Sequence, residues 1–500
     1  MTSVHLPVVI TVLPLATALF IPLVPRRVTA VVAGAVSVAV LTFASVAALF
    51  SLFGVIGGGE FRYTFGNWTA AIGVEFAVTH FSAVLAVLVT VVTLLVLVYS
   101  LRDRGPDVQP GVTGSFYMLV LVNTAAMLGI AYTNDLFNLY VFMEMLSIAS
   151  CAIVTINGKR DNLYAGLKYL IIGTVGAITI LFGMAILYML TGHLNMSIHG
   201  GLMAAVWAEH PVAMRLSLAL ILVGFAIKAA VFPVHTWLPD AHSVAPAPSS
   251  ALLSSLVVKI YLVGAMKILF VVAGVEVLSR TNIFLVLTWI GMIAMVGGST
   301  LALGQQKVKR ILAYSTVVNI GYIVLAVGIA TEEAVSVALF HMISHAVLKA
   351  GLFLSVGAVI HRTGKQYVQE FAGAGYNMPL AMTVFTICAL GMVGIPGTNG
   401  FMSKWYLILA AAGADRPIVL PVVLLSSFLN SLYFIPIVTR AFIQRSRSED
   451  HIMRRDNLPL STSLPLVTIA VFVVATGLYP ELIMPTVRQA AGILLTGGSP

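Results

Sequence analysis

The stretch that decides the fold is residues 226–250, AIKAAVFPVHTWLPDAHSVAPAPSS, where four prolines interrupt an apolar segment. Proline lacks a backbone donor and clashes with the preceding turn, so the sequence predicts a helix that breaks here. A second segment, residues 389–407, ALGMVGIPGTNGFMSKWYL, places Pro396 among four glycines, which weaken a helix further. Free backbone groups are tolerated inside a bilayer only where protein buries them or where they line a wet cavity. The two stretches therefore predict broken helices inside a membrane protein.

The composition places the whole chain in a lipid bilayer. Hydrophobic residues make up 59% of the 500 residues, charged residues make up 9%, and the mean hydropathy is +1.02. These values are typical of an all-α polytopic membrane protein and leave no room for a soluble domain. The first apolar run has Arg26 and Arg27 after it and no basic residue before it, so we expect a retained span and no cleaved signal.

Fourteen apolar segments are expected to cross the membrane. They cover about 4–24, 28–56, 78–101, 115–133, 135–157, 162–191, 214–232 with a continuation past Pro239, 244–272, 283–304, 308–330, 333–361, 379–413, 417–443 and 460–485. The broken segments are the seventh and the twelfth, five apart, which indicates two inverted five-helix repeats. The predicted division is helices 1–3 in residues 1–112, helices 4–8 in 113–274, helices 9–13 in 281–446, and helix 14 in 457–500.

The basic residues predict how the chain is oriented. The odd-numbered loops hold fifteen Lys and Arg residues, whereas the even-numbered loops and the C-terminal tail hold five. Cytoplasmic loops carry the excess of positive charge in membrane proteins. We therefore expect a multi-pass protein of the cell membrane with the odd loops in the cytoplasm and both termini outside.

Several classes of function are excluded by what the sequence lacks. The net charge of +9 comes from short loops, without a basic domain or interleaved aromatics, so nucleic acid is not an expected partner. Cys151 and Cys388 both lie in apolar runs and are interpreted as small core residues. The chain has no CxxC, GxGxxG or Walker-type loop, so we expect neither a cofactor nor a metal.

One carboxylate lies well inside a hydrocarbon segment. It is Glu144, in LFNLYVFMEMLSIASCAIV, residues 136–154. A charge in lipid costs at least roughly 2.5–3.5 kcal/mol on insertion scales, so such residues are rare and usually functional. Lys228, five residues before the break at Pro233, is the predicted partner. We expect the pair to act as a switch, because a proton or cation that arrives at one residue changes its attraction to the other. The alternative is a static ion pair that fixes helix packing.

Two further lysines lie in the eighth segment, SALLSSLVVKIYLVGAMKIL, residues 250–269. Lys259 has serines at 249, 250, 254 and 255 that could hold water beside it, and we expect it to carry protons. Lys267, eight residues on, is expected to extend toward the membrane interface.

A ladder of titratable residues follows in FHMISHAVLKAGLF, residues 340–353. His341, His345 and Lys349 are spaced four residues apart and share one helix face, which favours a proton relay because histidine titrates near physiological pH. The alternatives are packed neutral histidines or a His-x-x-x-His metal site, for which the sequence offers no third ligand. Lys404 follows the second break by eight residues and is interpreted as the counterpart of Lys228.

The remaining polar residues near the membrane ends carry less information. At the cytoplasmic end of the seventh segment, His235, Asp240 and His242 fit an entry role and a capping role equally. Three histidines of the sixth loop are expected to lie in solvent: His193, His199 and His210.

Three strings carry a resemblance to a known family. They are NDLFNLYVFMEMLSIAS (134–150), KAAVFPVHTWLPDAHSVAPAPSSALLSSLVVKI (228–260) and GIPGTNGFMSKWYL (394–407). Over about residues 60–480 the chain resembles the antiporter-like subunits shared by respiratory complex I, membrane-bound hydrogenases and Mrp multisubunit Na⁺/H⁺ antiporters.

The resemblance implies a role for each residue singled out above. It makes Glu144 and Lys228 the pair that drives proton movement, and Lys259 the bridging lysine. It places His345 and Lys349 in the relay, with His341 on the same face. It puts Lys404 at the exit. Cytoplasmic protons would enter near the seventh or eighth segment and leave past Lys404.

The resemblance also implies partners. The lysine in the twelfth segment and the short tail after the fourteenth favour the D-type subunit of an Mrp-type monovalent cation (Na⁺)/H⁺ antiporter. The alternative is a proton-pumping subunit of a complex I-like NADH-quinone oxidoreductase or a membrane-bound hydrogenase. In either case the chain is a transporter subunit and not an enzyme by itself. Its expected partners are other membrane subunits, H⁺, and Na⁺ or another monovalent cation.

Overall fold

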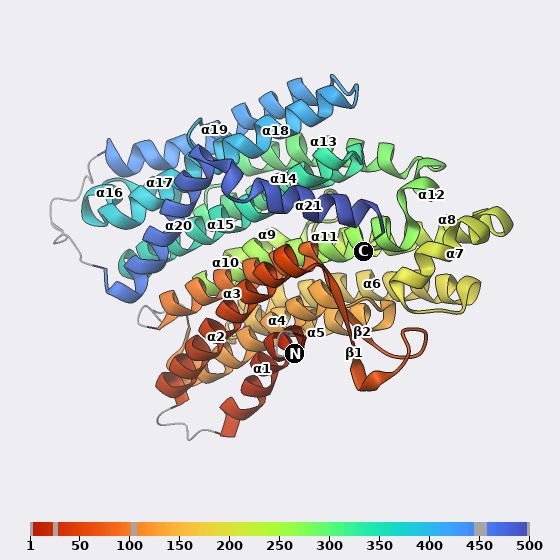
Figure 1. Cartoon of the computed structure of the whole chain (residues 1–500). Coiled ribbons are helices and arrows are strands. Elements are labelled where there is room, and N and C mark those ends of the chain that lie inside the picture. The colour runs from red at the N-terminus through yellow and green to blue at the C-terminus, as the bar shows by residue number, and fades with distance from the viewer. Residues whose placement is uncertain (1–3, 24–28, 102–107, 445–457, 498–500) are drawn as a thin grey trace.

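The computed structural model describes residues 4–23, 29–101, 108–444 and 458–497, and these residues are almost wholly helical (Figure 1). Thirteen described helices are long and apolar enough to cross a membrane. A fourteenth span is divided between α17 and α18, of 15 residues each. The expected number of spans is therefore confirmed, and so is the all-α membrane fold.

The elements follow one another along the chain with short connections. The first half contains α1 (Leu6–Phe20), η1 (Ile21–Leu23), α2 (Thr29–Gly58), β1 (Phe61–Thr64), η2 (Phe65–Asn67), β2 (Glu75–Val78), α3 (His80–Ser100), η3 (Pro110–Val112), α4 (Thr113–Tyr132), α5 (Leu136–Thr155), α6 (Arg160–Thr191), α7 (Met196–Glu209), α8 (Pro211–Lys228), α9 (Trp237–Val244), α10 (Ala247–Leu252), η4 (Leu253–Val257), α11 (Val258–Met266) and η5 (Lys267–Ala273). The second half contains α12 (Val275–Ser279), α13 (Ile283–Leu303), α14 (Val308–Ile329), α15 (Glu332–Thr363), η6 (Val368–Phe371), α16 (Ala374–Asn377), α17 (Pro379–Val393), α18 (Asn399–Gly413), α19 (Val419–Phe442), α20 (Leu460–Leu478), η7 (Pro480–Leu482) and α21 (Met484–Leu495).

Local sequence signals set the helix ends. Asp135 accepts a hydrogen bond from the backbone N–H of Asn138 at 2.7 Å at the start of α5. Thr331 does the same for α15, and Thr398 for α18. Short oxygen-bearing side chains are favoured at such positions because they satisfy free backbone donors. Gly364 ends α15 with a φ of 70°, a left-handed conformation that suits glycine.

Both predicted breaks are present. In the first, α8 ends at Lys228 and α9 resumes at Trp237, whose indole N–H donates to the carbonyl of Ile227 at 2.9 Å. In the second, α17 ends at Val393 and Gly394 turns the chain with a φ of 90° before α18 begins. A side chain at Gly400 would lie 1.9 Å from the carbonyl oxygen of Gly391, so the two half-helices pass each other closely because position 400 is glycine.

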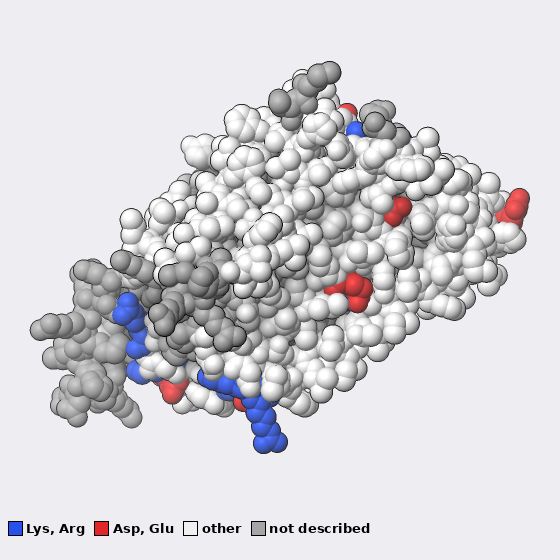
Figure 2. Space-filling model, turned by 90° about the horizontal axis from the view of Figure 1, so that it is seen from below, with Lys and Arg blue, Asp and Glu red and all other residues white. Residues whose placement is uncertain are grey.

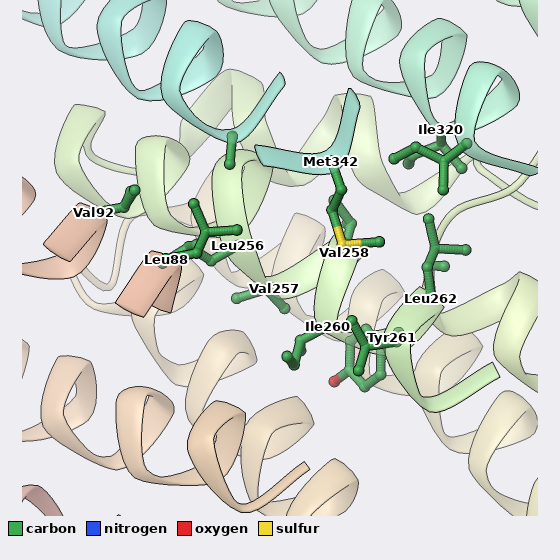
Figure 3. Packing of buried hydrophobic residues seen from close by; sticks show 14 of the residues in the cluster. Leu88, Val92, Leu256, Val257, Val258, Ile260, Tyr261, Leu262, Ile320 and Met342 are labelled. Atoms are coloured by element: carbon green, nitrogen blue, oxygen red, sulfur yellow. The ribbon is translucent and has the colours of Figure 1, made fainter. Parts of the chain in front are cut away.

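The eighth span and α15 form the centre of the molecule. Figure 3 shows Leu256, Val257 and neighbouring residues of the eighth span among side chains of α3, α14 and α15. In the eighth span, residues 247–273, 89% of the most apolar stretch is buried inside the protein. In α15 the whole of this stretch is buried. Two stretches of the eighth span, η4 and η5, are π-helical. Such wider turns are uncommon and often occur at functional sites.

Alternate loops meet at opposite ends of the bundle. At one end, the backbone N–H of Asn134 donates to Glu75 and that of Met196 donates to Asn134, which joins loops two, four and six. At the other end, Gln109 donates to the side chain of Asn157, which joins loops three and five. On the face shown in Figure 2, most basic side chains gather at the left end, beside the grey residues. Eight of the basic residues used to predict orientation lie outside the described residues: Arg26, Arg27, Arg102, Arg104, Arg445, Arg447, Arg454 and Arg455.

The second loop contains a hairpin that the sequence did not predict. Strands β1 and β2 pair antiparallel, with Phe61 opposite Val78 and Thr64 opposite Glu75. The Arg62 guanidinium lies 3.2 Å from Glu75, and the Asn134 amide donates to the same carboxylate at 2.8 Å. The hairpin therefore fastens the first three spans to the start of α5.

The C-terminal region differs from the expected single helix in 457–500. The fourteenth span, α20, ends at Leu478, and a separate helix, α21, follows. Pro480 and Pro485 account for the division, since proline cannot continue a helix. Val487, Ala490 and Leu494 form an apolar stripe that packs α21 against α3 and α15.

One expectation about the polar residues is wrong. His199 is fully buried in α7, which packs on η5, and burial lowers the pKa of His199 to about 4. The sequence predicts a solvated sixth loop because α7 is too short to stand out as a span. Lys267, expected to extend toward the membrane interface, reaches the loop end of the bundle, where its ammonium donates to the carbonyls of Ile130, Ala131 and Thr133 at 2.6–2.9 Å. It therefore caps the end of α4, where free carbonyls attract a cation.

Candidate functional site

The predicted ion pair is formed between α5 and α8. The ammonium of Lys228 lies 2.6 Å from Oε1 of Glu144 and donates to the hydroxyl of Ser147 at 2.9 Å. The lysine side chain is fully buried, whereas the glutamate side chain is 27% exposed. Helix α8 ends at Lys228, where the free carbonyls and the helix dipole also favour a cation. The charge of the lysine is thus held by a carboxylate, a hydroxyl and a helix end.

Tyr261 connects this pair to the eighth span. Its ring centroid is 5.9 Å from the Lys228 ammonium, and its hydroxyl donates to the carbonyl of Met143 at 3.4 Å. Met143 is the neighbour of Glu144, and Tyr261 is two residues from Lys259 on α11. The ion pair and Lys259 therefore lie on either side of one buried tyrosine.

Lys259 is held by the π-helical turn that precedes it. Its ammonium donates to the carbonyl of Ser254, in η4. The hydroxyl of Ser254 shares a hydrogen bond with that of Thr316, at 2.7 Å, which leads from the eighth span to α14. Thr316 then donates to the carbonyl of Leu312 at 3.1 Å. The serines expected to hold water beside Lys259 thus include one that contacts the neighbouring helix directly.

The carbonyl of Leu312 also accepts a hydrogen bond from Lys349, on α15. Its ammonium donates to Leu312 at 2.6 Å and to the hydroxyl of Ser315. Lys349 is fully buried in α15. Lys259 and Lys349 are therefore linked by Ser254, Thr316 and a shared backbone oxygen, with no charged residue in between.

The two histidines continue along α15 toward Lys404. The rings of His341 and His345 are stacked, with centroids 5.9 Å apart. Nδ1 of His341 is 2.9 Å from the hydroxyl of Ser403, the residue before Lys404. The ring of Tyr322 lies 5.2 Å from the His341 ring and 5.2 Å from the Lys404 ammonium. Ser403 and Tyr322 thus join the histidine pair to the lysine.

Lys404 lies at the second break but is not placed as Lys228 is. Its ammonium donates to the carbonyls of Met392 and Val393 at 2.9 Å each, and to the hydroxyl of Ser427 at 3.0 Å. The two carbonyls are at the end of α17, whereas Lys404 itself belongs to α18. Lys228 ends the first half of its broken helix, and Lys404 reaches back from the second half. Both lysines therefore lie at a helix break, but Lys228 precedes its break whereas Lys404 follows its break.

The end of the seventh span that lies beside the odd-numbered loops carries an ionic cluster. Asp240 lies 2.6 Å from Lys168 and 3.3 Å from Arg310. His242 is fully buried, and its ring stacks on Phe353 at 5.2 Å. Asp240 thus joins α6, α9 and α14, while His242 faces α15.

The described residues contain no group of three His, Cys, Asp or Glu side chains that could hold a metal ion. His341 and His345 stack face to face, and in the described structure neither ring nitrogen of His345 has a hydrogen-bond partner.

Sequence reasoning missed the neutral groups that connect the charged ones. The missed residues are Ser147, Tyr261, Ser315, Thr316, Tyr322, Ser403 and Ser427. Hydroxyls are common in membrane helices, and their spacing does not reveal which helix they face. Only Ser403 could have been singled out, because it directly precedes Lys404 in the sequence.

The chain matches known proteins over most of its length. Residues 133–430 match the family described as NADH:quinone oxidoreductase/Mrp antiporter, TM. The chain is 36% identical to the N subunit of the NADH-quinone oxidoreductase of Desulforudis audaxviator, over 98% of this chain and 99% of that one. It is 29% identical to the D-type subunit of the Na⁺/H⁺ antiporter of Alkalihalophilus pseudofirmus, over 86% and 85% of the two chains.

A solved structure has the same fold. A chain of the membrane-bound sulfane sulfur reductase, an archaeal respiratory membrane complex, superposes with a TM-score of 0.91 and 28% identity, covering 99% of this chain and 98% of that chain. The match extends through both breaks. The chain is therefore an antiporter-like membrane subunit and belongs to the NADH:quinone oxidoreductase/Mrp antiporter family.

Proposed function

We propose that this chain moves protons across the membrane as one subunit of a larger complex. The observation that carries the proposal is the 2.6 Å contact between Glu144 and the fully buried Lys228. A buried pair stabilises a fold poorly compared with apolar residues of similar size, and buried charges in membranes usually mark ion pathways. The partly exposed glutamate gives the pair an outward-facing member that another charge can reach.

The proposed route uses all seven predicted residues. Protons enter near Asp240 and His242 and load Lys228 or Lys259, with the Glu144–Lys228 pair setting when loading occurs. They continue through Lys349, His345 and His341 to Lys404. The hydroxyls of Ser254, Thr316 and Ser403 supply the donors and acceptors between the charged stations.

We favour partner subunits that carry out redox reactions and thereby drive proton transport. The extent of similarity to the N subunit of an NADH-quinone oxidoreductase supports a pump whose redox chemistry occurs in other subunits. The second candidate, which the twelfth-span lysine favours, is the D-type subunit of an Mrp-type Na⁺/H⁺ antiporter. Other membrane subunits are partners in both cases, and the division into two five-helix repeats belongs to the same proposal.

Proton movement is tested in everted membrane vesicles by quenching of a pH-sensitive dye. Lys228→Met removes the buried charge at nearly constant volume, and we expect it to abolish quenching while the protein still assembles. Lys159→Met, at an exposed lysine of the loop before α6, is the control and should transport normally. Normal quenching in Lys228→Met vesicles would rule the proposal out.

The partner set is tested by purifying the intact complex through a tag on this chain. Co-purification of quinone- or donor-oxidising subunits, and quenching started by an electron donor, would support the redox pump. Quenching that depends on added Na⁺ without an electron donor would support the antiporter.

Orientation in the cell membrane is tested with single cysteines, after Cys151 and Cys388 are replaced by serine. A membrane-impermeant thiol reagent should label Gly58→Cys from outside and Gln306→Cys only from the cytoplasmic side. Labelling of both from the same side would contradict the predicted placement of the termini outside.

A further inference from the structure

An apolar groove opens on the outer surface of the helix bundle and extends inward to the break of the seventh span. It has a volume of about 540 Å³ and is bounded by α8, α11, α13 and α14. Its walls include Val223 and Val286, which are 52% and 50% exposed. A volume in the range of roughly 300–1,000 Å³ is usual for a site that holds a small molecule.

The mouth of the groove is basic. Arg215 and Arg280 both line it, at the end of the bundle that carries the even-numbered loops. Arg280 lies 2.8 Å from Glu276, whereas Arg215 has no carboxylate partner among the described residues and lies 5.4 Å from the ring centroid of Trp207. A tryptophan beside an arginine is typical of the headgroup level of a membrane. Guanidinium groups bind phosphate through paired hydrogen bonds.

The length of the groove corresponds to one leaflet. From Arg215 to Ala226 the wall follows eleven residues of α8, or about 16 Å at 1.5 Å per residue. Half of the hydrocarbon thickness of a bilayer is about 15 Å. The deep end is formed by Val231, three residues beyond Lys228, in the break of the seventh span.

We propose that this groove binds one phospholipid of the leaflet on the side of the even-numbered loops. The phosphate lies against Arg215, and one acyl chain lies along α8 and α13 down to Val231. Because the surrounding lipid is as apolar as the groove, the tail is held by close packing against the wall, and the arginine selects an anionic headgroup. The tail covers the broken helix from the lipid side.

The test is photo-crosslinking in membranes that contain the intact complex, with phosphatidylglycerol carrying a photoactivatable acyl chain. Crosslinks should concentrate on residues 219–226, 283–290 and 323–327. Arg215→Gln should lower their yield about fivefold. Ala226→Trp, which fills the groove, should move the crosslinks elsewhere. Arg416→Gln, at an exposed arginine of another loop at the same end, is the control and should change nothing.

Three outcomes would overturn the proposal. Crosslinks spread evenly over all lipid-facing helices would mean that no lipid is held in the groove. Equal yields from the Arg215→Gln and Arg416→Gln proteins would remove the phosphate contact. Crosslinks that instead join the groove to a helix of another subunit would show that a protein partner fills it.

Discussion

At the scale of single residues, Lys228 and Glu144 are buried to different degrees, and the difference separates their roles. The lysine side chain is fully buried and donates to a carboxylate and a hydroxyl, whereas the glutamate is 27% exposed. Removing Glu144 leaves a buried ammonium without its counter-charge, which typically costs roughly 3–5 kcal/mol in a buried pair. Removing Lys228 leaves a carboxylate that can take up a proton.

The pair therefore offers a prediction that separates function from packing. Glu144→Gln alone should reduce the amount of assembled protein, because Lys228 is then buried without its counter-charge. The double variant Glu144→Gln/Lys228→Met should restore assembly and still fail to transport protons. Assembly is measured by the yield of complex in detergent and transport by dye quenching. If the double variant transports, the pair only fixes helix packing.

Lys404 supports a second prediction. Lys404→Arg keeps a cation that can donate to the carbonyls of Met392 and Val393, but arginine does not release a proton. We expect this variant to be as heat-stable as the wild type and inactive in transport. Lys404→Glu keeps a titratable group and should retain part of the activity, while Lys404→Ala should retain almost none.

Heat stability and dye quenching in the same preparations check these expectations. Transport by the arginine variant at the wild-type rate would show that position 404 only caps α17.

The charged stations of the site could be predicted from the sequence, because an ionisable residue in an apolar run is visible without knowing the fold. The connecting hydroxyls could not. Thr316 and Ser403 look like ordinary membrane-helix residues until the structure shows that they face Ser254 and His341. The roles of the stations stay predictions until transport is measured.

At the scale of elements, the break between α17 and α18 depends on a close backbone approach. A methyl group at Gly400 would lie 1.9 Å from the carbonyl oxygen of Gly391, so the half-helices would have to separate. Lys404, four residues along α18, would then lose its contacts with the end of α17.

We therefore expect Gly400→Ala to lower the melting temperature and to abolish transport, since overpacking of this kind typically costs about 1–3 kcal/mol. Gly413→Ala, at the other end of α18, meets nothing within 4 Å and is the matched control. Thermal unfolding followed by circular dichroism, together with dye quenching, distinguishes the two. Equal melting temperatures for the two variants would mean that the contact between Gly400 and Gly391 does not fix α17 against α18.

Sequence patterns predicted the breaks but not the finer elements. Proline and glycine mark a broken helix directly, whereas the π-helical turns η4 and η5 leave no pattern in composition or periodicity. The hairpin β1–β2 has only four residues in each strand, too few to stand out between two spans. Helix α21 was merged with the fourteenth span, although Pro480 and Pro485 mark the division in the sequence.

At the scale of the whole molecule, the middle of the line of buried charges lies in elements that lipid does not reach. The eighth span and α15 are enclosed by the other helices (Figure 1). The line begins at the α5–α8 pair, crosses the centre at Lys259 and Lys349, and ends at α18. The proposed route therefore crosses the middle of the molecule without meeting the hydrocarbon.

The central claim is that this line is one continuous route, and Lys349 lies at its middle. The most direct measurement is the initial rate of proton translocation in everted vesicles that contain the Lys349→Met protein in an assembled complex. Methionine fills the space of the lysine but carries no proton, so the account predicts no translocation above background. Translocation at the wild-type rate would contradict it.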